Sequence, residues 1–230
     1  MPDPSAGGVS PPPLPRAFFE RSPLDVAPDL IGTLLCRRTP DGELLAVQIV
    51  ETEAYLGPQD RASHARAGST ARTAPMFGAA GHAYVYRLYG MHWAFNVVAR
   101  TPEQAAGAVL VRAGLPVAGA ERQRARRGRP HDAEARLASG PGRLCQALAI
   151  TGADSGRDLT GGASLWIEAG PGGTRGDLLV GPRVNVGYAE AWAALPYRFG
   201  LAGSPALSRP FADPTPIDPA ESIPGGHHPR

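Results

Sequence analysis

The chain has 230 residues, a formal net charge of +2 and 43% hydrophobic residues. This length suits one domain with a sizeable core, and the small net charge gives no sign of bulk electrostatic attraction to nucleic acid. The sequence shows no signal-peptide pattern and no apolar run that would span a bilayer, so we expect an intracellular protein without membrane contact.

The basic residues are all arginine: there are 23 of them and no lysine. No ε-amino group is therefore available to form a Schiff base, whereas the guanidinium fork of arginine suits phosphate oxygens. The two cysteines, Cys36 and Cys145, lie among apolar neighbours and are expected to be buried, reduced thiols.

The first half of the chain predicts a tail, a helix and a hairpin. Residues 1–13 are rich in Pro, Gly and Ser and are expected to be disordered. Ser22 and Pro23 predict a helix start, with the helix ending near Leu30. Two strands, residues 34–38 and 44–53, flank a Pro-Asp-Gly turn and predict a hairpin.

The rest of the chain is predicted to add strands and short helices to the same domain. Strands are expected at residues 83–89, 92–99, 108–112, 164–169 and 183–187, and helices at 143–150 and 190–195. The pattern indicates an α+β fold: one domain over residues 14–210, built on a largely antiparallel sheet, followed by a disordered tail at 211–230.

The segment from Val50 to Ala99 concentrates polar and aromatic side chains between strands. Glu51 and Glu53 are two apart and should share one strand face, which would suit a metal site or an acid–base pair. The metal interpretation lacks partners, because no HExxH or paired CxxC pattern occurs. A GxSxG serine and a lysine-containing phosphate loop are absent as well. What remains is a carboxylate that activates water beside a flat substrate.

Each aromatic or polar residue here also has a plain structural interpretation. Tyrosines at spacing two, such as Tyr84 and Tyr86, belong more often to a core, and a lone His64 is more often a hydrogen-bonded structural residue. Asn96 is less ordinary, since a buried amide needs partners. Tyr89 lies at a predicted hairpin tip, where a protruding ring could wedge between bases.

Residues 122–129 hold five arginines. The run could face phosphates, or it could be a solvated helix end followed by a loop, and the sequence favours neither.

Taken together, these residues closely resemble the alkyladenine (3-methyladenine) DNA glycosylase family over about residues 16–209. The resemblance rests on the segments ETEAYLGPQDRASHARAG (51–68), RTAPMFG (72–78), GHAYVYRLYGMHWAFNVV (81–98), AVLVRAGLPVAG (108–119), GPGRLCQALAI (140–150) and the late GPRVNVGYAEAW, PYRFG and GSPALS. It implies a single mixed domain around a curved antiparallel sheet. One departure is Arg72-Thr73, where the family commonly has Arg-Asn.

The resemblance implies roles position by position. Glu53 corresponds to the general base that activates water, and Arg112 to an arginine that helps to hold that water. A base pocket is implied for Tyr55, His64, Tyr86 and Asn96, with Asn96 crowding the exocyclic amine of guanine. Tyr89 corresponds to the side chain that fills the gap left by the flipped nucleotide. Candidate contacts to the DNA backbone are Arg72, Arg124, Arg126 and Arg127.

The implied activity is excision of alkylated or deaminated purines from double-stranded DNA by a monomer without cofactor or metal, the first step of base excision repair. Substrates would be 3-methyladenine and 7-methylguanine, and also hypoxanthine and ethenoadenine. Stacked tyrosines would attract a cationic base by about 1–2 kcal/mol. Without lysine, we expect a monofunctional enzyme. Two other classes stay open: a silent module that binds damaged or single-stranded nucleic acid, and a hydrolase of free nucleosides.

Overall fold

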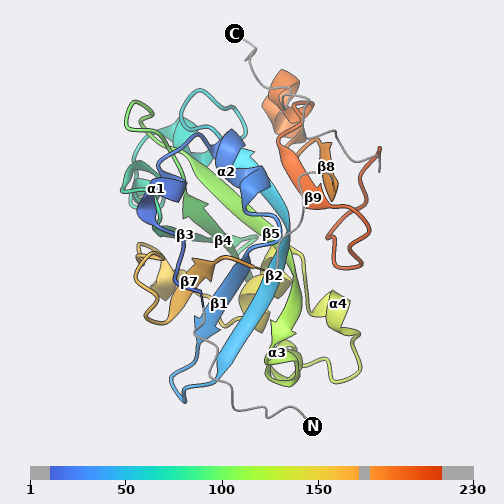
Figure 1. Cartoon of the computed structure of the whole chain (residues 1–230). Helices are drawn as coiled ribbons and strands as arrows, with labels where there is room; N and C mark the ends of the chain where they lie inside the picture. Colours follow the sequence, from blue (N-terminus) through green and yellow to red (C-terminus); the bar gives the residue numbers. More distant parts are fainter. Residues whose placement is uncertain (1–10, 171–176, 214–230) are drawn as a thin grey trace.

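The computed structural model describes residues 11–170 and 177–213. Nine strands form one open sheet in which every pair is antiparallel (Figure 1). The order is β3-β4-β5-β2-β1-β7, with β6 on β5, β9 on β2 and β8 on β9. The strands are β1 (Leu34–Arg38), β2 (Leu44–Tyr55), β3 (Ala83–Leu88), β4 (His92–Val98), β5 (Ala108–Ala118), β6 (Ala138–Ser139), β7 (Leu165–Glu168), β8 (Leu178–Gly181) and β9 (Arg198–Leu201). The predicted α+β class is confirmed.

Short helices surround this sheet. The α-helices are α1 (Arg16–Phe19), α2 (Pro23–Asp29), α3 (Ala120–Arg127), α4 (Glu134–Leu137) and α5 (Pro141–Ala147), and the 3-10 helices are η1 (His64–Ala67), η2 (Ala74–Phe77), η3 (Gly152–Asp154) and η5 (Gly187–Ala193). The predicted start of α2 is confirmed, since the Ser22 hydroxyl accepts a hydrogen bond from the Leu24 amide at 3.3 Å. The predicted hairpin of β1 and β2 also forms.

The two longest strands carry the middle of the molecule. β2 pairs with β1 over its first half and with β9 over its second half, while β5 runs along its other edge. Glu53 therefore lies between Leu110 of β5 and Arg198 of β9. The β2–β5 register shifts on both sides of Glu51, which indicates bulges that re-aim nearby side chains. A carboxylate here sits on a strand that is paired along both edges.

The core fixes β2 against the N-terminal helices. Phe19 and Leu30 are fully buried, and the Thr52 hydroxyl donates to the Ala27 carbonyl of α2 at 2.8 Å. Cys36 and Cys145 are buried and free, as predicted. Burial raises the pKa of the Cys36 thiol to about 12, and raises that of Cys145 further, so both stay protonated.

The strand predicted for residues 183–187 is wrong, because these residues form no strand. Arg183 is bound in a buried ion pair, and Asn185 has a φ of 61°, which an extended strand does not allow. The strands after β7 are β8 and β9, which lie on either side of this segment. The predicted helix at 190–195 is replaced by η5, which is kinked at Glu190 (φ 53°). The predicted helix at 143–150 begins two residues earlier, as α5.

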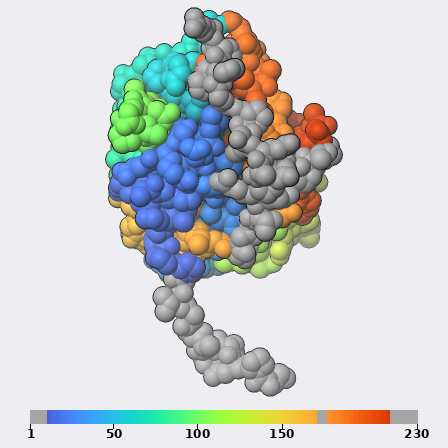
Figure 2. All heavy atoms as spheres, turned by 45° about the horizontal axis from the view of Figure 1, so that its top comes forward, coloured from blue at the N-terminus to red at the C-terminus, as the bar shows by residue number. Residues whose placement is uncertain are grey.

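The two predicted tails fall mostly outside the described residues: 1–10 and 214–230 are not described. Near both ends of the described range, the chain contacts the rest of the domain. Pro13 forms an isolated β-bridge with Glu168. The guanidinium carbon of Arg198 lies 3.8 Å from the centroid of the Phe211 ring. Figure 2 shows the blue N-terminal segments over much of one face, against the gold segment that contains β7. Among the described residues no helix is long and apolar enough to cross a bilayer.

Candidate active site

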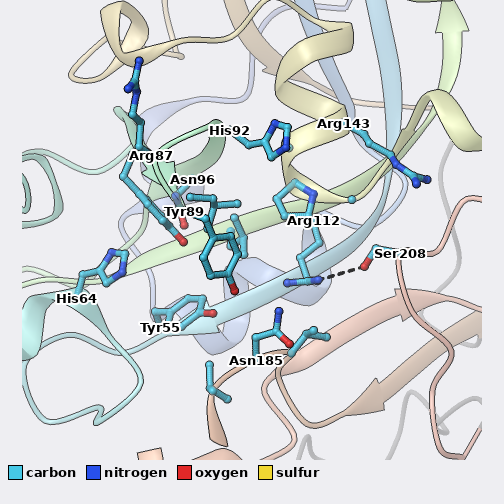
Figure 3. Close-up of a pocket in the computed structure, with 18 of the residues that line it drawn as sticks. Tyr55, His64, Arg87, Tyr89, His92, Asn96, Arg112, Arg143, Asn185 and Ser208 are labelled. Atoms are coloured by element: carbon cyan, nitrogen blue, oxygen red, sulfur yellow. Dashed lines mark hydrogen bonds between the residues drawn. The ribbon is translucent and has the colours of Figure 1, made fainter. Parts of the chain in front are cut away.

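A cavity of about 870 Å³ opens beside the ends of β2, β3, β4 and β5. Its wall includes most of the residues that the sequence singled out: Tyr55, His64, Arg72, Tyr86, Tyr89, Asn96, Arg112 and Arg127. It also includes Arg129 of the predicted arginine run, and residues to which the sequence assigned no role, among them Arg143, Asn185, Tyr188, Ser208 and Arg209. Figure 3 shows Tyr55 and His64 on one side of this space and Arg112 and Ser208 on the other, with Tyr89 between them in this view.

Glu53 lies beneath the cavity floor. Its side chain is fully buried, and its carboxylate accepts hydrogen bonds from the Tyr55 hydroxyl (2.8 Å) and the Val184 amide (2.7 Å). Arg112 Nη1 lies 3.3 Å from the same oxygen, Oε1, that Val184 contacts. These partners, Tyr55, Val184 and Arg112, all line the cavity. The Glu53 carboxylate thus lies directly behind the cavity surface. A ligand or a water molecule would contact it only after one of these three groups had moved aside.

Glu51 fixes Arg112 from the other side. Arg112 Nε donates to Glu51 Oε1 at 3.1 Å, and the Ser208 amide donates to Oε2 at 2.6 Å. Arg198 Nη1 lies 3.5 Å from the same Glu51 oxygen, Oε1. Burial opposes the charge on Arg112, but Glu53 and Glu51 outweigh it and raise the pKa of the guanidinium. The two acids therefore share one face, as predicted, but Glu51 is taken up by structural contacts.

A second buried ion pair supports Tyr55. Arg183 and Asp60 are both fully buried as side chains and join through two hydrogen bonds of 2.5 and 3.0 Å. Arg183 also donates to the Ala54 carbonyl at 2.9 Å and lies 4.8 Å from the centroid of the Tyr55 ring. Burial, and then the charge of Glu53, raise the pKa of Tyr55, so its hydroxyl remains a donor to Glu53.

The other wall of the cavity is aromatic. His64 and Tyr86 meet edge to face with centroids 4.5 Å apart, and Tyr84 and Tyr86 lie 5.4 Å apart. His64 Nδ1 and the Tyr84 hydroxyl share a hydrogen bond of 2.9 Å, which leaves Nε2 unused by that bond. Burial, and then the charge of Arg72, lower the pKa of His64 to about 4, so the ring is neutral at physiological pH. Tyr84 itself is buried in a small cluster, and only Tyr86 of the pair reaches the cavity.

Asn96 closes the inner end of this wall. It is 3% exposed and pairs with Tyr84 across β3 and β4. Its Nδ2 donates to the Tyr84 carbonyl at 3.0 Å, which fixes the amide and supplies the partner that burial demands.

Tyr89 lies at the tip of the β3–β4 hairpin, as predicted. It is 79% exposed, and its neighbour Met91 is 77% exposed. Tyr89 has a φ of 49° and Gly90 a φ of 72°, and two left-handed residues in succession are the geometry of a tight hairpin turn. The side chain therefore protrudes from this turn.

The arginines of residues 122–129 divide into some that line the cavity and some that do not. Arg127 lines the cavity together with Arg129 and Arg143, and like charges from Arg143 and Arg129 are among the causes, after burial, that lower the pKa of Arg127. Arg124, in contrast, is bound to Glu121 and to the Asp132 carbonyl. Neither Arg124 nor Arg126 lines the cavity.

Residues 68–73, where the sequence departs from the family pattern, form a closed loop around Thr73. The Thr73 hydroxyl donates to the Gly68 carbonyl at 2.7 Å and accepts from the Thr70 amide at 2.8 Å. This places Arg72 with its guanidinium carbon 5.3 Å from the centroid of the Tyr86 ring. Thr73 thus closes the loop with its hydroxyl.

Comparison with known proteins identifies the family of this chain. The family model described as methylpurine-DNA glycosylase matches residues 17–205. A protein of Anaeromyxobacter dehalogenans that carries the name 3-methyladenine DNA glycosylase is 48% identical over 198 residues, which cover 86% of each chain. A protein of the same name from Methanocella arvoryzae is 44% identical and covers 86% of this chain and 96% of its own.

The family match shows a hydrolase that acts on N-glycosyl bonds in DNA, and a buried carboxylate behind an aromatic, arginine-rimmed cavity fits this class. The chain belongs to the methylpurine-DNA glycosylase family.

Proposed function

We propose that this protein removes damaged purines from duplex DNA, with Glu53 as the general base for an attacking water. The observation that carries the proposal is the buried Glu53 carboxylate, held by three groups that line the cavity. Cleavage of an N-glycosyl bond develops positive charge on the sugar, which a nearby carboxylate stabilises while it takes the proton from water.

Arg112 and the aromatic wall have complementary roles in this proposal. Arg112 orients the water beside Glu53, because its guanidinium already bridges Glu53 and Glu51. The flipped base stacks between Tyr55 and the pair of His64 and Tyr86. Asn96, with its amide fixed by the Tyr84 carbonyl, crowds the exocyclic amine of normal guanine.

Two further proposals concern DNA. Tyr89 fills the gap left by the flipped nucleotide, supported by its exposure on a tight turn. Arg127 with Arg129 and Arg143 contacts phosphates, supported by the gathering of like charges at the cavity. The substrates we propose are 3-methyladenine, 7-methylguanine, hypoxanthine and ethenoadenine.

We also propose that the enzyme is monofunctional. The chain contains no lysine, and its carboxylate chemistry uses water as the nucleophile. Borohydride should trap no covalent protein–DNA adduct, and a trapped adduct would contradict the proposal.

The central test is release of free 3-methyladenine from methylated duplex DNA by the wild type and by Glu53→Gln. The variant keeps the shape of the side chain but not its basicity, so release should fall by about 10²- to 10⁴-fold while DNA binding is retained. Glu51→Gln is the matched control for charge, and its base release should exceed that of Glu53→Gln. No release by the wild type would favour a binding module instead, and equal activity on free nucleosides would favour a nucleoside hydrolase.

A further inference from the structure

We infer that the guanidinium group of Arg72 biases the base pocket toward uncharged damaged purines and against cationic ones. This inference rests on the proposed function and concerns which class of lesion the same pocket accepts best. It refines the expectation that the tyrosine walls alone favour a cationic base.

The first observation is that a cation already lies at each tyrosine wall. Arg183 lies 4.8 Å from the centroid of the Tyr55 ring, and Arg72 lies 5.3 Å from that of the Tyr86 ring. An aromatic ring attracts a cation through its electron-rich face, and a guanidinium within about 6 Å makes use of that attraction. A cationic purine would therefore meet rings whose electron density is already drawn toward arginine.

The second observation is that Arg72 is not neutralised. Asp60 pairs with Arg183, and Glu53 with Glu51 pairs with Arg112. Within residues 11–170 and 177–213, by contrast, no carboxylate forms an ion pair with Arg72. Its positive charge is thus left to act on whatever occupies the cavity that it lines.

The field of Arg72 already reaches the groups that would touch a base. After burial, the charge of Arg72 is the cause that lowers the pKa of His64 to about 4. The same charge works against the burial that raises the pKa of Tyr84 and Tyr86. A charge that disfavours a proton on His64 also disfavours a positive ring placed against it.

The loop geometry orders the backbone that carries Arg72. The Thr73 hydroxyl ties residue 70 to the carbonyl of residue 68, so the residue immediately before Thr73 is carried on a closed turn. The backbone that carries Arg72 is thus already ordered, so binding a base does not require the entropy of ordering a free loop.

The test compares two lesions in one duplex sequence: 7-methylguanine, which is cationic, and hypoxanthine, which is neutral. Single-turnover release rates are measured for the wild type, Arg72→Gln and Arg72→Glu, and the ratio of cationic to neutral release is compared. Intrinsic differences in leaving-group ability cancel between variants, and so does any phosphate contact of Arg72, because both duplexes carry the same backbone. Arg66→Gln is the matched control: it removes one exposed arginine of the same region that does not line the cavity.

The expected result is a ratio about two- to fivefold higher in Arg72→Gln and higher again in Arg72→Glu, with no change in Arg66→Gln. A ratio within experimental error of the wild type in both Arg72 variants would overturn the inference, and so would a wild type that releases only 7-methylguanine. Either result would leave the proposed glycosylase intact. Failure of the wild type to release any damaged base would instead overturn both proposals.

Discussion

The floor and the rim of the cavity hold their charges in opposite ways. On the floor, Arg112 and Arg183 are nearly or fully buried and each is bonded to carboxylates. On the rim, Arg129 and Tyr89 are exposed. The difference teaches that the groups proposed for the chemistry are enclosed by the fold and paired, whereas the groups proposed to meet DNA are exposed at the surface. Each prediction below tests one side of this contrast.

The largest effect is expected at the buried pair of Arg183 and Asp60. Arg183→Met leaves a buried carboxylate without its cation, so the free energy of unfolding should fall by about 3–5 kcal/mol. Urea unfolding measures this. Arg143→Met, on the rim, is the control and should change stability by no more than about 0.5 kcal/mol. Equal losses in the two variants would contradict the contrast between floor and rim.

His64, in the aromatic wall between floor and rim, should make the free energy of unfolding depend on pH. Its pKa is about 4 in the folded protein and 6.5 in the reference state, so between these values the unfolded chain binds more protons. The free energy of unfolding therefore falls as the pH falls from about 6.5 to about 4. His64→Gln removes this contribution, and its urea midpoint should drop less between pH 7 and pH 4.5 than that of the wild type. Parallel drops would show that His64 does not titrate in this way.

The sequence predicted the floor well where the residues are close together. Glu51, Glu53 and Tyr55 follow one another on one strand, so periodicity alone places them on one face. It did not find Arg183 with Asp60, because a pair 123 positions apart leaves no local pattern. Residues 183–187 alternate apolar and polar side chains like a strand, and only the tertiary contacts of Arg183 and the left-handed Asn185 make them a loop.

The arginine run shows the same limit. The arginines of residues 122–129, on α3 and the following turn, are all candidates for the same role by composition. In the structure Arg124 pairs with Glu121, whereas Arg127 reaches the cavity. Which helix face meets the cavity depends on how α3 packs against α5, and composition does not carry that information. The six cavity arginines beyond Arg72 come from five separate segments of the chain: 87, 112, 127–129, 143 and 209.

Tyr89 offers a test of the rim that leaves the floor untouched. Tyr89→Ala should change the free energy of unfolding by no more than about 0.5 kcal/mol, because the side chain is exposed. Base release from duplex DNA should fall roughly tenfold, since nothing then fills the gap that the flipped base leaves. Tyr89→Leu keeps an apolar wedge and should retain more activity than Tyr89→Ala. An equal defect on single-stranded DNA, which has no stack to restore, would argue against the wedge.

The smallest effect is expected from a single arginine of the rim. If Arg143 contacts one phosphate, Arg143→Gln should weaken DNA binding about equally for damaged and undamaged duplexes and reduce the slope of log K against log salt by roughly 1. Arg122 provides the control, since it is bound to Asp41 at 2.7 Å and to Glu43 at 3.4 Å and lies outside the cavity wall. Arg122→Gln should leave the slope unchanged. A slope that falls equally in both variants would mean that DNA senses the total charge of the protein, and that the rim is no more than a part of a diffuse basic surface.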